Sequence, residues 1–296
     1  MIRLCAGCKV NLGLRVLGRR PDGYHELDSV FWPLAAPCDE LRIRPRPEPG
    51  ITVRCDVPGI DPTRNTLTRA HAAFAALAGH APGLDITLVK RIPSGAGLGG
   101  GSSDAAALLL WLNSIAAVPL PHAELTRAAV AVGADVPFFL DPRPSRVTGI
   151  GETVVPLTGE MPPLFLVLVC PGIHVSTGEA FATLDELRAR GPSAGASPSQ
   201  NSLTKQARAD NGNRLFGAAL PDLHNDLEAA VFPRHPQLAE LKVELGRLGA
   251  LAAGMTGSGS SVFGLFAARA VASAAAARLR GRYPRVYCKA LGNAGM

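Results

Sequence analysis

Aromatic residues are scarce in this sequence, and its positive charge is dispersed. Only 5% of the 296 residues are aromatic, which argues against the stacking platforms with which proteins bind single-stranded nucleic acids. The net charge is +6, yet the nearest approach to a basic cluster is Arg15, Arg19 and Arg20. Nucleic-acid-binding proteins usually concentrate their positive charge. The composition therefore favours a small anionic ligand at least as much as a nucleic acid, and we expect no nucleic-acid partner.

Cysteines and long apolar runs are also few. The six cysteines are spread thinly along the chain, unlike those of small secreted domains, so we expect reduced thiols and a cytoplasmic location. Cys5 and Cys8 have C-x-x-C spacing, but a zinc ribbon needs a second pair, and a thioredoxin-type motif opens a helix rather than a strand. No apolar run approaches the roughly 18 residues of a membrane span, and we expect no secretory signal.

What the sequence does contain is a dense glycine loop at residues 93–106, PSGAGLGGGSSDAA. Five glycines fall within seven residues, and the apolar run AAALLLWL follows Asp104. Ser102, Ser103 and Asp104 are residue types that begin helices, so the run predicts a buried helix. A glycine loop that leads into a helix N-terminus directs backbone N–H groups and the positive end of the helix dipole at one point. This arrangement predicts a phosphate site.

Known glycine loops differ from this one in their context. A Walker A loop needs a lysine after its last glycine, and no lysine occurs between Arg91 and Ala106. The protein-kinase loop joins two strands. Gly95, Gly97 and Gly100 fit the dinucleotide pattern G-x-G-x-x-G, but so many glycines make that match almost inevitable, and no repeated strand–helix alternation surrounds it. A flexible linker is disfavoured because the loop lies between a predicted strand and a buried helix.

The pattern along the chain predicts two domains, residues 1–158 and 159–296, of mixed helix and strand. The following elements are expected from periodicity and turn residues: strands and turns up to about residue 60, a helix at 64–79, a helix that follows the glycine loop to about residue 114, a helix at 122–133, a basic segment with turns at 141–157, a strand at 163–172, helices at 177–189 and 236–249, a turn at 253–261, a strand at 262–266, an alanine-rich helix and a last strand at 285–291. The second half resembles a ferredoxin-like layer of helices on an antiparallel sheet. Residues 190–214 are low in hydrophobic residues and predict a mobile loop.

Three polar residues in apolar surroundings are candidates for chemistry. Lys9 and Asn11 lie two residues apart in a predicted strand, so their side chains share one face, although a strand lysine is more often a solvated edge residue. Asp135 lies in the apolar segment AVAVGADVPFFL, where it is either a turn or capping residue or a functional carboxylate. A nearby Lys9 would keep Asp135 ionised as a candidate base. The turn TGSGSS at 256–261 is either a plain turn or a second loop that closes over the phosphates.

The glycine loop resembles the central motif of the GHMP kinases, a family that includes galactokinase, homoserine kinase and mevalonate kinase. The segment CKVNLGLRVLGRRPDGYHELDSVF at 8–31 resembles members whose substrate carries a cytidine diphosphate. The segments GADVPFF, PGIHVSTGEAF, HNDLE and TGSGSSVF follow in the family's order, so the resemblance covers nearly the whole chain. There are two departures: Cys-Ala-Gly-Cys precedes Lys9 where the family usually has Ala-Pro-Ala, and the 190–214 loop is longer than the family pattern.

This resemblance implies an α+β, two-domain GHMP kinase fold, with a ribosomal-protein-S5-like N-terminal domain and a ferredoxin-like C-terminal domain. It implies ATP- and Mg²⁺-dependent phosphorylation of the 2-hydroxyl of a small cytidine-diphosphate-bearing substrate, in the non-mevalonate route to isoprenoid precursors. We expect a monomer or weak homodimer that binds no membrane. Two alternatives stay open: a kinase of the same family that acts on homoserine or a mevalonate derivative, and a non-catalytic nucleotide-binding regulator.

Residue roles implied by the resemblance fall into three groups. Asp135 is expected to take the proton of the acceptor hydroxyl, and Lys9 to stabilise the charge. The expected substrate-binding residues are Asn11, Tyr24, His25, Ile150, Thr177 and Phe181, with Tyr24 and Phe181 enclosing the base and His25 bonding its edge. The expected ATP-binding residues are Asn65, Lys90, Pro93, Ser94, Gly95, Ala96, Gly97, Leu98, Gly99, Gly100, Gly101, Ser102 and Ser103. No metal ligand is assigned, although Ser102 or Ser103 could coordinate magnesium.

Overall fold

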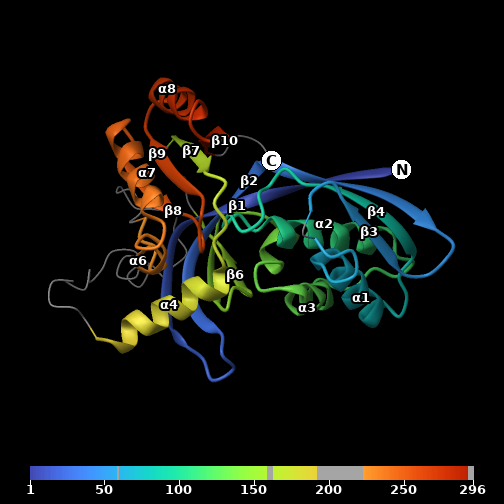
Figure 1. Ribbon diagram of the computed structural model, residues 1–296. Coiled ribbons are helices and arrows are strands. Elements are labelled where there is room, and N and C mark those ends of the chain that lie inside the picture. Colours follow the sequence, from blue (N-terminus) through green and yellow to red (C-terminus); the bar gives the residue numbers. More distant parts are fainter. Residues whose placement is uncertain (59, 159–162, 192–222, 293–296) are drawn as a thin grey trace.

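Two β-sheets, each covered by helices, lie side by side in the computed structural model (Figure 1). The structure describes residues 1–58, 60–158, 163–191 and 223–292. The expected α+β fold is confirmed. No helix in the described residues is long and apolar enough to cross a membrane.

The first sheet is organised around two long antiparallel strands, β1 (Ile2–Arg19) and β2 (His25–Arg46). Its order is β3-β4-β2-β5-β6, and β1 pairs with β2. The shorter strands are β3 (Ile51–Cys55), β4 (Gly83–Val89), β5 (Ser145–Gly149) and β6 (Thr153–Pro156). The segment at 141–157, which was expected to be rich in turns, also contains the strands β5 and β6. These strands form a hairpin because β5 pairs with β2 over Leu27–Phe31, a long-range contact that local composition does not reveal.

Helices cover one face of this sheet and form the first core. They are α1 (Thr66–Ala78), α2 (Gly100–Ile115), α3 (His122–Val132) and the short 3₁₀ helix η1 (Pro137–Leu140). The apolar run of α2 is buried, as predicted, and it packs among the core residues of α1 and α3. The helix begins earlier than its serines suggest, because Gly99 occupies the N-cap position. Its N-terminus therefore opens directly from the glycine loop.

The second sheet has four antiparallel strands in the order β10-β7-β9-β8. Its strands are β7 (Leu164–Cys170), β8 (Ala252–Met255), β9 (Val262–Phe266) and β10 (Arg285–Leu291), and the helices are α4 (Thr177–Ala189), α6 (Glu228–Val231), α7 (Pro236–Arg247) and α8 (Arg269–Arg280). This strand order is that of a ferredoxin-like sheet. The strand β8 begins before, and overlaps, the segment predicted as a turn.

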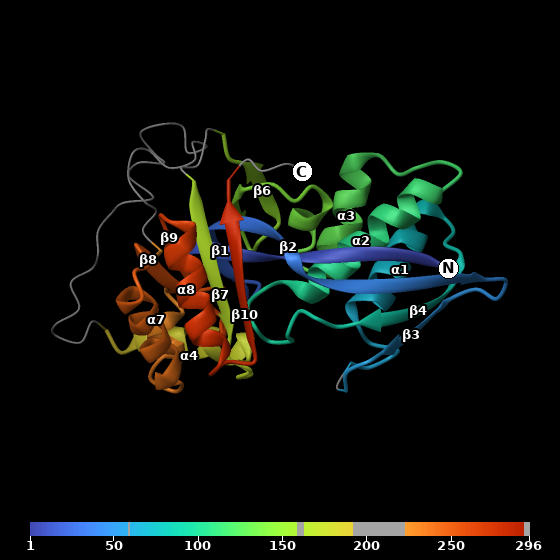
Figure 2. The ribbon, with the colours of Figure 1, turned by 90° about the horizontal axis from the view of Figure 1, so that it is seen from above.

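The second sheet is buried on both faces, and one face forms a core with the first half. Successive strand side chains point to opposite faces: Val167 and Val169 of β7 pack with α7 and α8, whereas Leu166 and Leu168 pack with Val10 of β1 and its neighbours. Figure 2 shows α7 and α8 on the side of this sheet away from the first half. The domain boundary at 158 stays a prediction. Residues 159–162, and most of the predicted 190–214 loop, lie outside the described residues.

Candidate active site

A cavity of about 1130 Å³ lies where the glycine loop, β1 and α4 meet. Both halves of the chain contribute to its lining. The predicted site residues that line it are Lys9, Asn11, Tyr24, His25, Asn65, Lys90, residues 93–102, Asp135, Ile150, Thr177 and Phe181. Of the predicted residues, Ser103 alone does not line it, and its side chain is buried. Segments that are distant in the sequence thus converge on one site.

The glycine loop forms one wall of the cavity. Gly95, Gly97 and Gly99 have positive φ angles of 64°, 73° and 70°, a conformation that side-chain-bearing residues rarely adopt. A Cβ atom at Gly97 would also overlap the carbonyl oxygen of Thr256 from the second glycine turn. The loop then continues into the N-terminus of α2, where unpaired N–H groups and the helix dipole favour an anion. The geometry agrees with the expected phosphate cradle.

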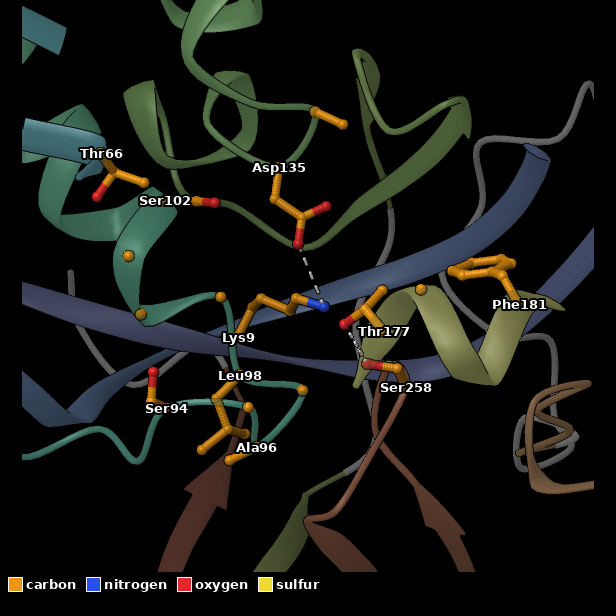
Figure 3. Close-up of a pocket in the computed structure, with 18 of the residues that line it drawn as sticks. Lys9, Thr66, Ser94, Ala96, Leu98, Ser102, Asp135, Thr177, Phe181 and Ser258 are labelled. Carbon is orange, nitrogen blue, oxygen red and sulfur yellow. Dashed lines mark hydrogen bonds and ion pairs between the residues drawn. The ribbon is translucent and has the colours of Figure 1, made fainter. Parts of the chain in front are cut away.

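Lys9 and Asp135 face one another in the middle of the cavity (Figure 3). The distance from Lys9 Nζ to Asp135 Oδ2 is 3.6 Å, and the lysine is buried whereas 31% of the aspartate side chain is exposed. Lys9 Nζ also donates a hydrogen bond to Asn11 Oδ1 and lies 4.4 Å from the centre of the Phe31 ring. Burial lowers the pKa of Lys9, and the Asp135 carboxylate opposes that shift. A buried cation thus lies beside an accessible carboxylate.

The second glycine turn contributes polar groups from the other half. The Asn11 backbone N–H donates to Thr256 Oγ1 at 2.9 Å, and Thr256 Oγ1 donates to the Gly97 carbonyl at 3.1 Å. Thr177 and Ser258 share a hydrogen bond of 2.8 Å between their hydroxyl oxygens. Gly257 and Ser258 line the cavity, so of the two alternatives left open for this turn the geometry agrees with a loop at the site and not with a plain turn.

Asn65 and Lys90 line the cavity, but both already have protein partners. Asn65 is the N-cap of α1, where its Oδ1 accepts from the N–H groups of Leu67 and Thr68. Lys90 Nζ bonds Asp39 and, at 3.0 Å, Asp104 Oδ2. Burial opposes the charge on Lys90, but the two carboxylates outweigh it and raise its pKa.

Asp104 is the unusual member of this buried cluster. Its side chain is 2% exposed, and its Oδ1 has no hydrogen-bond partner among the described residues. Burial raises the pKa of Asp104 to about 7; the Lys90 ammonium opposes this shift, and the Asp39 carboxylate adds to it. The side chain that sequence analysis assigned to the start of a helix therefore belongs to a buried charge network behind the loop.

The other end of the cavity is aromatic. His25, at the start of β2, stacks on Phe181 of α4 with ring centroids 4.6 Å apart and planes inclined by 25°. Tyr24 lies in the β1–β2 turn and is 59% exposed. Ile150 lies in the β5–β6 turn, and its N–H donates to Glu152 Oε2 at 2.6 Å. In Figure 3, Phe181 and Thr177 lie on one side of the Lys9–Asp135 pair, and Thr66 and Ser102 lie on the other. The cavity thus has the glycine loop at one end and an aromatic group at the other.

Several residues that shape this site were not among the site residues predicted from the sequence. Asp39 and Asp104 hold Lys90, Asp185 bonds His25, and Asn225 Nδ2 donates to the carbonyls of Met255 and Gly257 at 2.8 Å each. A signal existed for Asp185, since it lies four residues after Phe181 in a predicted helix and thus on the same face. Asn225 lies in the segment HNDLE, one of the segments that follow the family's order. The sequence did not indicate which groups its side chain contacts.

Comparison with known proteins agrees with this geometry. Models of the GHMP kinases N terminal domain and the GHMP kinases C terminal region match residues 65–141 and 204–285. The chain is 47% identical to a 4-diphosphocytidyl-2-C-methyl-D-erythritol kinase of Nitratidesulfovibrio vulgaris, over 97% of each chain. It is 44% identical to one of Solidesulfovibrio magneticus, covering 95% of this chain and 93% of the relative.

Solved structures show the same likeness. A crystal structure of 4-(cytidine 5'-diphospho)-2C-methyl-D-erythritol kinase has a TM-score of 0.74 and 36% identity, covering 99% of this chain and 100% of that one. The homoserine kinase of Cytophaga hutchinsonii has a TM-score of 0.69 at 18% identity, covering 98% and 94%, and this likeness concerns the fold alone. The chain belongs to the GHMP kinases and, within them, to the family of the 4-diphosphocytidyl-2-C-methyl-D-erythritol kinases.

Proposed function

We propose that this protein transfers the γ-phosphate of ATP to the 2-hydroxyl of 4-diphosphocytidyl-2-C-methyl-D-erythritol, giving the 2-phosphate and ADP. As a member of a kinase family, it uses ATP. The observation that carries the proposal is the position of the Lys9–Asp135 pair, which lies in one cavity between the glycine loop at the N-terminus of α2 and an aromatic group. The names of its relatives supply the substrate.

The donor phosphates would lie on the glycine loop. Phosphoryl transfer depends mainly on positioning and on neutralising charge, and the N–H groups at the start of α2 provide both. Pro93 to Ser102 would surround the phosphates, while Asn65 and Lys90 would border the adenine end.

Magnesium would enter with the nucleotide. Magnesium bound with a nucleotide takes one or two protein oxygens and completes its shell with phosphates and water. Ser102 lines the cavity at the helix N-terminus and offers such an oxygen, whereas Ser103 does not reach the lining. The described residues contain no group of three or more His, Cys, Asp or Glu side chains suited to a metal, which fits a metal held largely by the nucleotide. When bound, Mg²⁺ would neutralise charge on the phosphates.

The transfer step uses Asp135 and Lys9. Asp135 accepts the proton of the 2-hydroxyl as that oxygen forms its bond to the γ-phosphorus and the bond from phosphorus to the ADP oxygen breaks. Lys9 lies within 3.6 Å of the same carboxylate and stabilises the negative charge of the reacting groups. A positioned base typically contributes about 10²- to 10⁴-fold in rate. Asn11 keeps the lysine in place through its short hydrogen bond.

The aromatic end would receive the cytosine ring. Tyr24 and Phe181 offer ring faces for stacking, which contributes beyond simple burial, and His25 offers a ring nitrogen to the base edge. Thr177 and Ile150 would contact the substrate between its base and the reacting hydroxyl. Homoserine and mevalonate contain no base, so this end of the cavity favours the cytidine-bearing substrate over both.

We also propose where the enzyme lies in the cell, its oligomeric state and its partners. We propose a cytoplasmic monomer or weak homodimer that binds no nucleic acid. The six free cysteines support the cytoplasmic location, and the dispersed positive charge supports the lack of a nucleic-acid partner. A purely regulatory nucleotide-binding protein is the alternative, and the Lys9–Asp135 pair argues against it because a sensor needs no base.

A coupled ADP-release assay tests the proposal. The wild-type protein should phosphorylate the cytidyl substrate and should show no comparable activity with homoserine or mevalonate. Asp135→Asn should lower kcat by about 10²-fold or more while ATP binding is retained. Asp141→Asn is the matched control, since Asp141 is an exposed residue paired with Arg143 and does not line the cavity. Faster turnover of homoserine would refute the substrate, and near-normal turnover of Asp135→Asn would refute the base.

A further inference from the structure

Asp185 on α4 holds the imidazole of His25 by one edge. His25 Nε2 lies 2.9 Å from Asp185 Oδ1 and 3.0 Å from Oδ2, although the residues are 160 positions apart. Both side chains line the cavity, and only 12% of the histidine side chain is exposed. The β1–β2 turn lies beside α4 in the fold (Figure 1). Phe181 stacks on the face of the same ring, so the ring is fixed by an edge contact and a face contact.

This contact determines which ring nitrogen carries the proton. An ionised carboxylate only accepts hydrogen bonds, so Nε2 must donate. In the neutral ring, Nδ1 is then left as a pure acceptor. No described residue forms a hydrogen bond with Nδ1. Arg19 Nε also lies 4.0 Å from Asp185 Oδ2.

We propose that Asp185 fixes the Nε2–H tautomer of His25 and thereby selects a cytosine base over a uracil base. This inference rests on the proposed function. Cytosine carries an amino group where uracil carries a carbonyl oxygen. Nδ1, as an acceptor, can accept a hydrogen bond from the cytosine amino group. The uracil oxygen is also an acceptor, so it forms no hydrogen bond with Nδ1 and the two lone pairs repel each other. Asp185 acts through His25, so it is a positioning residue rather than a catalytic one.

The expected size of this selectivity follows from leaving a polar group unpaired. Such a mismatch in a partly buried site lowers affinity by roughly 10- to 100-fold. Without Asp185, the imidazole is free to place its proton on either nitrogen. The protein should then bind cytidine less tightly and should gain some ability to bind uridine.

Binding of CDP and UDP tests this selectivity. Isothermal titration with a saturating non-hydrolysable ATP analogue keeps both diphosphates out of the nucleotide site. The wild-type protein should prefer CDP by about 10- to 100-fold, and Asp185→Ala should bring the ratio close to one. Glu179→Ala is the matched control on the same helix, because Glu179 is 71% exposed, pairs with Arg234 and does not line the cavity. It should keep the wild-type ratio.

The tautomer itself is measured by nitrogen-15 NMR, with His25→Gln used to assign the signals. We expect a proton on Nε2 alone in the wild-type protein and a mixture in Asp185→Ala. A protonated Nδ1 in the wild-type protein, or an equal loss of CDP and UDP affinity in Asp185→Ala, would overturn the inference. If turnover of the cytidyl substrate persists with either result, the proposed function stands and only the role of Asp185 fails. If the wild-type protein binds neither diphosphate, the proposed function fails and the inference fails with it.

Discussion

The buried carboxylate of Asp104 makes a quantitative prediction about stability and pH. Its ordinary pKa of 3.8 is raised by burial to about 7, so the folded protein holds this proton more tightly than the unfolded chain does. Stability from this group is then greatest below pH 4 and falls as the pH rises from about 4 to about 7. Replacing Asp104 with asparagine keeps the shape of the side chain but removes the titration.

The expected magnitude follows from the two pKa values. Each unit of difference corresponds to about 1.4 kcal/mol. Compared with its value at low pH, the contribution of Asp104 to the free energy of unfolding is therefore smaller by about 2 kcal/mol at pH 5 and by about 4 kcal/mol at pH 8. Relative to the wild-type protein, Asp104→Asn should gain about 2 to 3 kcal/mol of unfolding free energy between these pH values. The attraction of the Asp104 carboxylate to Lys90 is already included in the raised pKa, so the expected rise with pH needs no separate correction for that ion pair.

Urea denaturation of both proteins at pH 5, 6, 7 and 8, followed by circular dichroism, measures this difference. Asp141→Asn serves as the control, because its carboxylate is 57% exposed beside Arg143 and should show no comparable trend. A difference that stays flat with pH would show that Asp104 is ionised throughout, with Lys90 compensating for its burial. A difference that falls with pH would reverse the sign and refute the reasoning.

Two further substitutions test how the loops are held. Gly97→Ala should destabilise the fold and raise the KM for ATP, because its Cβ would strike the Thr256 carbonyl and its φ is +73°. The control is Gly246→Ala in α7, which has open space around it and should raise the melting temperature. Equal effects of the two substitutions would refute the steric argument. Asn225→Ala removes two hydrogen bonds to buried carbonyls and should cost about 2 to 4 kcal/mol in urea denaturation, while a change below about 0.5 kcal/mol would show that the turn needs no such support.

Local patterns predicted the elements around the site well. The apolar run after Asp104 predicted α2, and the spacing of Lys9 and Asn11 placed both side chains on one face of β1. These features depend on nearest neighbours in the chain, which periodicity reports directly. The aspartate at 135 was likewise identified as a carboxylate that needs a partner in apolar surroundings.

Partners in space could not be predicted in the same way. The strands of the β5–β6 hairpin were not predicted because the pairing with β2 is remote in the sequence. Aspartate is a residue type that often begins helices, yet the Asp104 side chain points inward and bonds Lys90. Asp185 and His25 are 160 residues apart, and only the packing of α4 against the β1–β2 turn brings them together. Tertiary contacts decided each of these cases.

The glycine loop cannot by itself define the geometry of a phosphate site, since glycine has the greatest backbone freedom. Its shape is instead imposed by neighbours: the Lys9 N–H donates to the Leu98 carbonyl at 3.0 Å, and the Ser261 N–H donates to the Ala96 carbonyl at 3.3 Å. One of these donors belongs to β1, and the other belongs to the second glycine turn in the other half. The first contact also fixes Lys9, the proposed catalytic lysine, relative to the glycine loop. A substitution that loosens the second glycine turn should therefore displace the glycine loop, even where the substituted residue itself does not contact the nucleotide.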